Sequence, residues 1–388
     1  MLDRTNQRVE SLYVHVPFCA HKCEYCAFYS EAAEGAVINR YVAALLRELE
    51  LVASDLKPVT IFFGGGTPSL LNLRQWEQIL KTMERLNLLG AQEWTVECNP
   101  ATVSLDKARL LRAHGVNRIS MGVQSLDEKL LNRLGRVHSR EMVFKSFEIL
   151  RKAGFDNLNL DLMFAIPGQS LEVWQNTLRE AMALGSEHLS CYEVIYEEDT
   201  PLYEQLQAGQ FSVDEEDACA MYEELVEVAS SHGFQQYEIA NFARHVSPQP
   251  DEVPDRACRH NINYWRGGSF HALGPSATSY VRGIRAKNWS STLLYCECLE
   301  RGRRAIESQE ELSPLQRAGE IAAFGLRMNA GWPLNQFQKT TGLDLTAEWA
   351  FEINQLVEQD LGRLNAQRFQ LTRRGLRFTD LAAQEFLR

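Results

Sequence analysis

Residues 11–26 read SLYVHVPFCAHKCEYC, and this stretch decides the fold of the 388-residue chain. Its first six residues are rich in valine, leucine and tyrosine, which predicts a strand. Three cysteines, Cys19, Cys23 and Cys26, follow within eight residues. Thiolates spaced four and three residues apart can wrap one compact metal centre, and these soft ligands suit zinc or an iron–sulfur cluster.

The cysteine loop offers no fourth thiolate nearby, because the next cysteine along the chain is Cys98. A centre with three protein ligands keeps one position open, as reactive sites do and structural sites do not. On a four-iron cluster, that position is one iron that a small chelating molecule can occupy. Incidental buried cysteines and a zinc site completed by His21 are the alternatives. We favour the cluster because the loop directly follows the first predicted strand.

Short apolar runs alternate with helical patterns from residue 11 to about residue 240. After the first strand, strands are predicted at 59–63, 94–98, 118–121, 158–164 and 189–195. Between them, helices are predicted at 37–52, 73–86, 104–114, 139–153 and 170–184. This alternation predicts an α/β fold whose parallel sheet curls into a full or partial (β/α) barrel with helices outside. In such folds, chemistry collects at the carboxyl ends of the strands.

The pattern changes near residue 245, and three segments are predicted. HVSPQPDEVPDRA at 245–257 predicts a loop, and 258–290 is rich in glycine and aromatics without a clean period. Residues 310–388 read as helices, then FQLTRRGLRF at 369–378 predicts a two-strand hairpin before a last helix, which is a winged-helix pattern. We therefore expect a core over 1–245, a linker and motif segment over 246–305, and a winged-helix-like domain over 306–388.

Charge and hydropathy exclude several classes of protein. Lys plus Arg number 40 against 51 Asp plus Glu, a formal charge of −11, which argues against binding nucleic acid through its phosphates. No segment approaches the ~18 apolar residues of a membrane span, and no signal peptide is recognisable. We expect a cytoplasmic protein, where clustered thiols are metal ligands more often than disulfides.

The segment Tyr13-Val-His15-Val-Pro17-Phe18-Cys19, followed by the cysteine triplet, resembles the radical S-adenosylmethionine (SAM) superfamily. More narrowly, it is similar to the oxygen-independent coproporphyrinogen III oxidase-like family. The resemblance implies that Cys19, Cys23 and Cys26 hold a [4Fe–4S] cluster. It also implies that the amino and carboxyl groups of SAM occupy the fourth iron.

Polar and glycine residues at the ends of the predicted strands match SAM-contact positions of this family. Glycines at a strand end let the backbone approach a ligand closely, and an acid there can bond ribose hydroxyls or an ammonium group. The resemblance implies contacts to one SAM, or to two, from Tyr13, Tyr25, Gly65, Gly66, Thr67, Glu97, Gln124, Arg136 and Asp161. A second SAM would be held by Gln124, Arg136 and Asp161.

Two functions are compatible with this resemblance: radical decarboxylation of coproporphyrinogen III and heme delivery by a HemW-type chaperone. Oxidases of the group usually carry a fourth cysteine where this chain has Phe28, and a longer segment than the eighteen residues that precede Cys19. His260-Asn261-x-x-Tyr264-Trp265 matches the HNxxYW motif of the chaperone branch. The chaperone is therefore our prediction, and the oxygen-independent coproporphyrinogen III dehydrogenase is the alternative.

The HNxxYW motif suits heme chemically. A neutral imidazole such as that of His260 is a strong axial ligand for heme iron, and Cys258 and His271 are fallback ligands. Tyr264 and Trp265 offer flat apolar faces with polar edges. We expect a protein that passes heme to hemoproteins such as respiratory enzymes, some of them at the membrane, and we leave a homodimer open.

Overall fold

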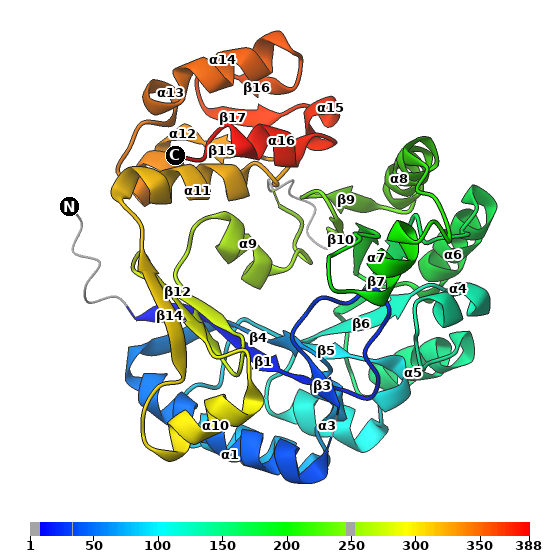
Figure 1. Ribbon diagram of the computed structural model, residues 1–388, viewed down its shortest axis with the longest axis vertical. Helices are drawn as coiled ribbons and strands as arrows, with labels where there is room; N and C mark the ends of the chain where they lie inside the picture. Colours follow the sequence, from blue (N-terminus) through cyan, green and yellow to red (C-terminus); the bar gives the residue numbers. More distant parts are fainter. Residues whose placement is uncertain (1–7, 33, 246–252) are drawn as a thin grey trace.

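The computed structural model describes residues 8–32, 34–245 and 253–388, so 246–252 of the predicted linker lie outside the described part. A nine-stranded sheet runs in the order β11-β1-β4-β5-β6-β7-β8-β10-β9 (Figure 1). Its parallel strands are β1 (Val9–Val16), β4 (Leu56–Gly65), β5 (Glu93–Cys98), β6 (Arg118–Gln124), β7 (Leu158–Phe164), β8 (His188–Glu193) and β11 (His271–Leu273).

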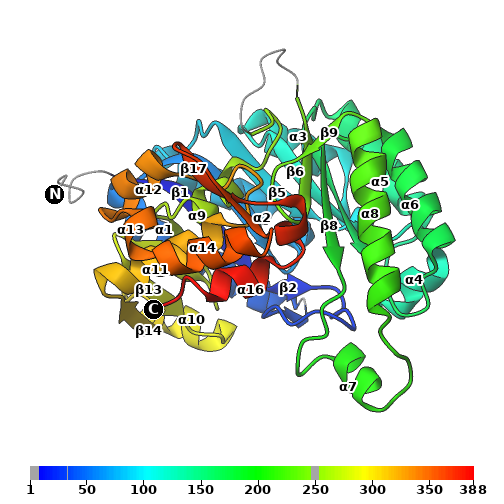
Figure 2. The same ribbon diagram turned by 90° about the horizontal axis from the view of Figure 1, so that it is seen from above.

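The predicted alternation of strands and helices is confirmed. The helices that follow the strands are α1 (Gly35–Val52), α2 (Leu73–Arg85), α3 (Leu105–Ala113), α4 (Glu128–Arg133), α5 (Arg140–Lys152), α6 (Leu171–Leu184), α7 (Pro201–Gln207) and α8 (Glu215–Ser231). Figure 2 shows α5, α6 and α8 along the side of the sheet that carries β6 and β8. Local signals start these helices: Asn72 and Gln75 form a capping box on α2, and Ser139 and Ser170 cap α5 and α6.

The sheet is an open, partial barrel. At one edge, β10 (Asn241–Arg244) pairs antiparallel with β8, and β9 (Phe234–Gln236) pairs antiparallel with β10. At the other edge lies the three-residue β11. In the described strands, β9 and β11 each pair on one side only, so the ring of backbone hydrogen bonds does not close.

The two faces of the sheet differ in polarity because side chains alternate along each strand. Ile61, Phe63, Trp94 and Val96 point outward, where they join the main apolar core under the helices. The intervening positions carry polar groups on the inner face, such as Thr60, Glu93 and Thr95 on β4 and β5. The functional candidates therefore lie inside the barrel, on the face opposite its main core.

The C-terminal part has a separate apolar core built on Trp332, Trp349, Phe369 and Phe386. A three-stranded sheet, β15 (Trp332–Pro333), β17 (Arg368–Leu371) and β16 (Gly362–Leu364), packs there. Its helices are α11 (Pro314–Gly325), α12 (Leu334–Thr341), α13 (Leu345–Glu348), α14 (Ala350–Glu358), α15 (Arg373–Leu376) and α16 (Thr379–Gln384). Helices and a small wing sheet make this unit winged-helix-like, as predicted.

The predicted hairpin at 369–378 is wrong in detail. The hairpin lies one strand earlier, between β16 and β17, and 373–376 form α15. The side chain of Thr372 accepts a hydrogen bond from the N–H of Gly375 and so starts the helix. A Cβ at Gly375 would lie 1.9 Å from the carbonyl oxygen of Leu361, which shows how tightly this turn packs.

The segment after residue 258, where no period was visible, contains α9 (Arg259–Trp265) and a second sheet of β12 (Thr278–Val281), β13 (Ile284–Asn288) and β14 (Ile306–Glu311), with α10 (Thr292–Glu300) between the last two. Figure 1 shows α9 between the main sheet and α11. The guanidinium of Arg266 donates to the carbonyl oxygen of Gly331 at 2.6 Å, and Asn329 N–H donates to the carbonyl oxygen of Tyr237 at 3.0 Å. These bonds join the winged-helix-like unit to the barrel.

Candidate functional site

The cysteine loop crosses the carboxyl ends of the strands and is held by backbone bonds. The N–H of Glu24 donates to the carbonyl oxygen of Leu134 at 3.1 Å, and the Glu24 carbonyl accepts from Leu202 N–H at 2.9 Å. Tyr25 packs on an apolar cluster that includes Leu130 and Leu134. The loop is therefore anchored to two segments far away in the sequence.

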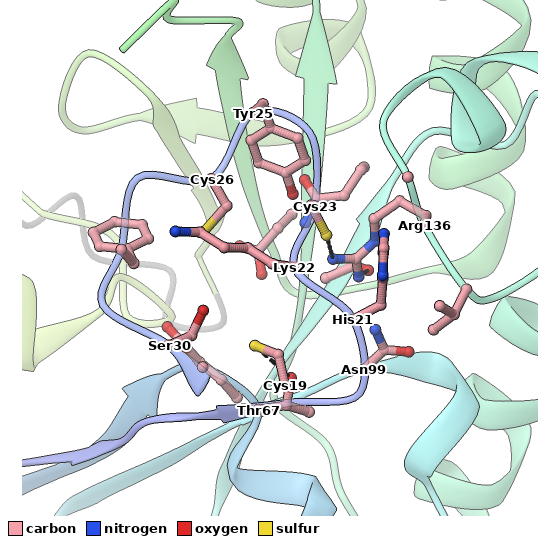
Figure 3. A pocket seen from close by; sticks show the side chains of 18 of the residues that line it. Cys19, His21, Lys22, Cys23, Tyr25, Cys26, Ser30, Thr67, Asn99 and Arg136 are labelled. Carbon is pink, nitrogen blue, oxygen red and sulfur yellow. Dashed lines mark hydrogen bonds between the residues drawn. The ribbon is translucent and has the colours of Figure 1, made fainter. Parts of the chain in front are cut away.

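Cys19, Cys23 and Cys26 line one cavity of about 670 Å³, and each thiol is partly buried (Figure 3). The guanidinium Nη1 of Arg136 donates to Cys23 Sγ at 3.5 Å, and Thr67 Oγ1 donates to Cys19 Sγ at 3.7 Å. Burial raises the pKa of the Cys19 and Cys26 thiols. Hydrogen-bond donors thus already face two of the sulfurs that a metal centre would make negative.

The donor set fits a cluster better than a single ion. Among the described residues, no three His, Cys, Asp or Glu side chains converge closely enough to hold one metal ion. A cubane spreads its thiolate ligands over different iron atoms, so the three sulfurs need only share a cavity. Three soft thiolates that share one cavity fit the [4Fe–4S] centre expected from the resemblance.

Gly65 and Gly66 permit a close approach between β1 and β4. Gly65 has φ +101°, and a Cβ there would lie 2.4 Å from the His15 ring, while a Cβ at Gly66 would lie 2.7 Å from a carbonyl oxygen of the loop. Their N–H groups are engaged: Gly65 N–H donates to Glu97 Oε2 at 3.1 Å, and Gly66 N–H donates to the Val16 carbonyl at 2.8 Å. The amino group of a ligand would contact the carbonyl oxygens of this segment, because an ammonium group donates and cannot accept.

Two acids line the cavity wall, at the end of β5 and within β7. Burial, reinforced by the negative charge of Asp161, raises the pKa of Glu97 to about 8. Asp161 accepts hydrogen bonds from Ser120 Oγ at 3.1 Å and Asn159 Nδ2 at 2.7 Å, and burial raises its pKa as well. Glu97 is thus poised to exchange a proton near neutral pH, so it can accept or donate a bond to a hydroxyl.

The end of β6 is distorted where it meets the cavity. Gln124 adopts φ +65°, which few residues other than glycine adopt, and the pairing register with β7 shifts between Gly122 and Gln124. Arg136 Nη2 donates to the Gly122 carbonyl at 2.7 Å. Gln124 and Arg136, which comes from the segment after α4, both line the larger cavity. Eight of the nine predicted SAM residues line it: Tyr25, Gly65, Gly66, Thr67, Glu97, Gln124, Arg136 and Asp161.

The ninth, Tyr13, lies in a smaller chamber of about 200 Å³ deeper in the barrel. Its hydroxyl bonds His15 Nδ1 at 3.1 Å. The chamber also contains three members of the HNxxYW motif: His260, Asn261 and Tyr264. It shares Glu97, Ser120, Asp161 and Tyr192 with the larger cavity. The cysteine loop and the predicted heme motif therefore face two adjacent spaces that share part of their walls.

His260 is completely buried, and both of its ring nitrogens are engaged. Nδ1 bonds Thr60 Oγ1 at 2.9 Å, and Nε2 bonds the Tyr264 hydroxyl at 2.7 Å. Its ring stacks on Phe62 with centroids 5.4 Å apart. Burial, together with the positive charge of Arg118, lowers the pKa of His260 to about 3. The imidazole is therefore neutral at physiological pH.

The helix that carries the motif, α9, is held by contacts at its start and at its end. The Glu93 carboxylate accepts from the N–H groups of Arg259 at 2.9 Å and His260 at 3.0 Å, which caps the helix. Trp265 lies away from the chamber, with the Arg327 guanidinium 5.0 Å from its ring centroid.

The fallback heme ligands are also occupied. Cys258 is buried, with its Sγ 3.6 Å from Glu93 Oε1. His271 Nε2 bonds Asp55 Oδ2 at 3.0 Å. Neither side chain lines either chamber.

Sequence reasoning missed Arg118, Ser120 and Tyr192, which line the chambers. For Arg118 and Ser120 the signal was present: Arg118, Ser120, Gly122 and Gln124 alternate with Ile119, Met121 and Val123 along β6. A period of two with one polar face indicates that this face lines a cavity or solvent.

Comparison with known proteins places the chain in a family. The Radical SAM superfamily matches residues 13–181, and the HemN C-terminal domain matches residues 312–378. The heme chaperone HemW of Lactococcus lactis subsp. lactis is 32% identical over 383 residues, 98% of each chain. This chain belongs to the HemW heme chaperone family. HemW of Bacillus subtilis is 33% identical, covering 95% of this chain and 96% of that one.

The fold of this HemW-family chain also matches a solved structure. The coproporphyrinogen III oxidase HemN of Escherichia coli superposes with a TM-score of 0.83 at 21% identity, covering 98% of this chain and 90% of that one. This likeness confirms the fold expected for the barrel and its C-terminal unit. Within the described residues, no helix is both long and apolar enough to span a bilayer.

Proposed function

We propose that this chain binds heme and transfers it to hemoproteins such as respiratory enzymes, in the cytoplasm or at the membrane. The observation that carries the proposal is similarity over nearly the full chain to proteins named heme chaperones. Phe28 supports it, because the oxidases usually have a cysteine at the matching position.

In this proposal Cys19, Cys23 and Cys26 hold a [4Fe–4S] cluster. The eight predicted SAM residues that line the larger cavity hold SAM. When bound, the cluster supplies an electron that can cleave the sulfonium of SAM. Carbonyl oxygens of Gly65 and Gly66 accept from the amino group, and Glu97 bonds ribose hydroxyls. Gln124 and Arg136 offer donors to a carboxylate. Tyr13 lines the smaller chamber, so in this proposal it contributes to the SAM site indirectly, through the hydrogen bond between its hydroxyl and His15 Nδ1.

The motif residues His260, Asn261, Tyr264 and Trp265 are proposed to contribute to heme handling. Because both ring nitrogens of His260 are bonded, ligation of iron by this side chain requires release of Thr60 or Tyr264. The neutral state of His260 favours such ligation, since protonated imidazole cannot bind a metal.

Anaerobic reconstitution with iron and sulfide tests the cluster. We expect cluster absorbance in the wild type, its loss in a Cys19→Ala/Cys23→Ala/Cys26→Ala variant, and its retention in a Cys219→Ala control, because Cys219 is exposed and remote. Cluster absorbance that survives the triple substitution would refute the ligand assignment.

Two assays on the reconstituted wild type test the function. Heme titration followed by mixing with apomyoglobin should show binding and transfer. Incubation with reductant, SAM and coproporphyrinogen III should show no decarboxylation. Decarboxylation without heme binding would replace the chaperone with the oxidase.

A further inference from the structure

Exposed apolar side chains gather at the mouth of the larger cavity. Phe28 is 71% exposed, Ile195 68%, Val137 50% and Tyr192 43%, and all four line that cavity. Single exposed apolar residues are ordinary, but several around one opening mark a binding surface. They come from three separate segments: the cysteine loop, the segment before α5, and the end of β8 with the residues after it.

The smaller chamber cannot enclose heme. Pockets that enclose drug-sized ligands measure ~300–1,000 Å³, and the chamber beside His260 measures about 200 Å³. The larger cavity, at about 670 Å³, has a rim suited to one face of a flat apolar ring.

The mouth also carries an imidazole and a cation. His21 is the one histidine among the described residues that lines the larger cavity; it is exposed, and no hydrogen bond within the described part of the chain engages its ring. Lys22 is exposed beside it, and Figure 3 shows both on the same loop as the cysteines. Neutral imidazole is a common heme ligand, and an ammonium group pairs with a propionate.

We propose that heme docks across the mouth of the larger cavity, with its ring on Phe28, Val137, Tyr192 and Ile195 and its iron toward His21. Lys22 pairs with a propionate. This site rests on the proposed heme-chaperone function and gives that function a location. While His260 keeps its hydrogen bonds to Thr60 and Tyr264, heme therefore lies above the cysteine loop and outside the smaller chamber.

Heme titration followed by Soret absorbance tests the site on the full-length protein. Phe28→Ser/Ile195→Ser should weaken binding by roughly a hundredfold, since each of the two large apolar contacts contributes about a factor of ten. Phe351→Ser/Leu381→Ser is the matched control, because these side chains are 68% and 62% exposed on the C-terminal unit. It should bind heme as the wild type does. His21→Ala should shift the Soret and low-spin electron paramagnetic resonance signals.

The outcomes separate this site from the function on which it rests. A wild type that binds no heme refutes the proposed function. A wild type that binds heme, with unchanged affinity in Phe28→Ser/Ile195→Ser, refutes the site alone. Loss of heme from His260→Ala combined with full binding by Phe28→Ser/Ile195→Ser would also refute it and assign the heme to the motif chamber. Cluster iron content, measured in parallel, shows that each variant is folded around its cysteine loop.

Discussion

Replacing His260 with glutamine should change how the stability of the barrel depends on pH. In the folded chain the pKa of His260 is lowered to about 3 by burial and by Arg118, whereas an unfolded chain has a histidine pKa of about 6.5. Below pH 6.5 the His260 imidazole takes up a proton in the unfolded chain, whereas in the folded chain it stays neutral. Stability from this residue is therefore complete above pH 6.5 and is lost progressively as the pH falls toward 3.

At pH 5.0 the loss from His260 alone should be about 2 kcal/mol, because the pH lies about 1.5 units below the unfolded pKa. A glutamine has no such titration, and its amide can keep a bond with Thr60 or Tyr264. The wild type should therefore lose about 2 kcal/mol more than His260→Gln between pH 7.5 and 5.0. Other buried histidines, such as His188, titrate equally in both proteins and cancel in the difference.

Urea denaturation followed by tryptophan fluorescence measures both proteins at the two pH values. His232→Gln, on an exposed helix end, controls for removal of a histidine as such. Equal losses in the wild type and in His260→Gln would refute the inference that the fold holds this imidazole neutral.

Three further predictions follow from single contacts. Arg136→Met removes the donor to Cys23 Sγ, so the reduction potential of the cluster should fall by ~60 mV, which is one decade of a one-electron equilibrium. A redox titration followed by electron paramagnetic resonance measures it, and an unchanged potential would contradict this contact. Gly65→Ala should destabilise the chain by several kcal/mol, and Gly90→Ala, with a similar positive φ but open space, by only ~1–2 kcal/mol in thermal denaturation; equal effects would show that close packing is unimportant. Glu93→Gln weakens the cap of α9, so amide hydrogen exchange across 259–265 should quicken roughly tenfold, and unchanged protection would refute the capping role.

The parallel strands were predictable because a strand buried between helices is a short, mostly apolar run. β7 has the predicted bounds, 158–164. By contrast, α9 was invisible because its start depends on Glu93, a residue more than 160 positions earlier. No local pattern in 258–290 records that long-range cap. The wing was misplaced for a related reason, since Thr372 caps a helix in a segment that otherwise reads as a strand.

The larger cavity of the candidate site was more predictable from the sequence than the smaller chamber was. The cysteine spacing and the residues at strand ends located the larger cavity, because carboxyl ends of parallel strands meet at one rim. The placement of Tyr13 and the complete burial of His260 depend on how the inner face is filled, which a linear reading does not specify. The polar alternation on β6 was the available clue to that filling.

The unclosed sheet has a mechanical consequence. In a closed barrel, strand number and stagger together fix the circumference. Here a seam runs between β9 and β11, and side-chain and backbone contacts to the C-terminal unit bridge it, such as the bond from Arg266 to Gly331. The circumference can therefore widen at this seam without breaking any strand pair.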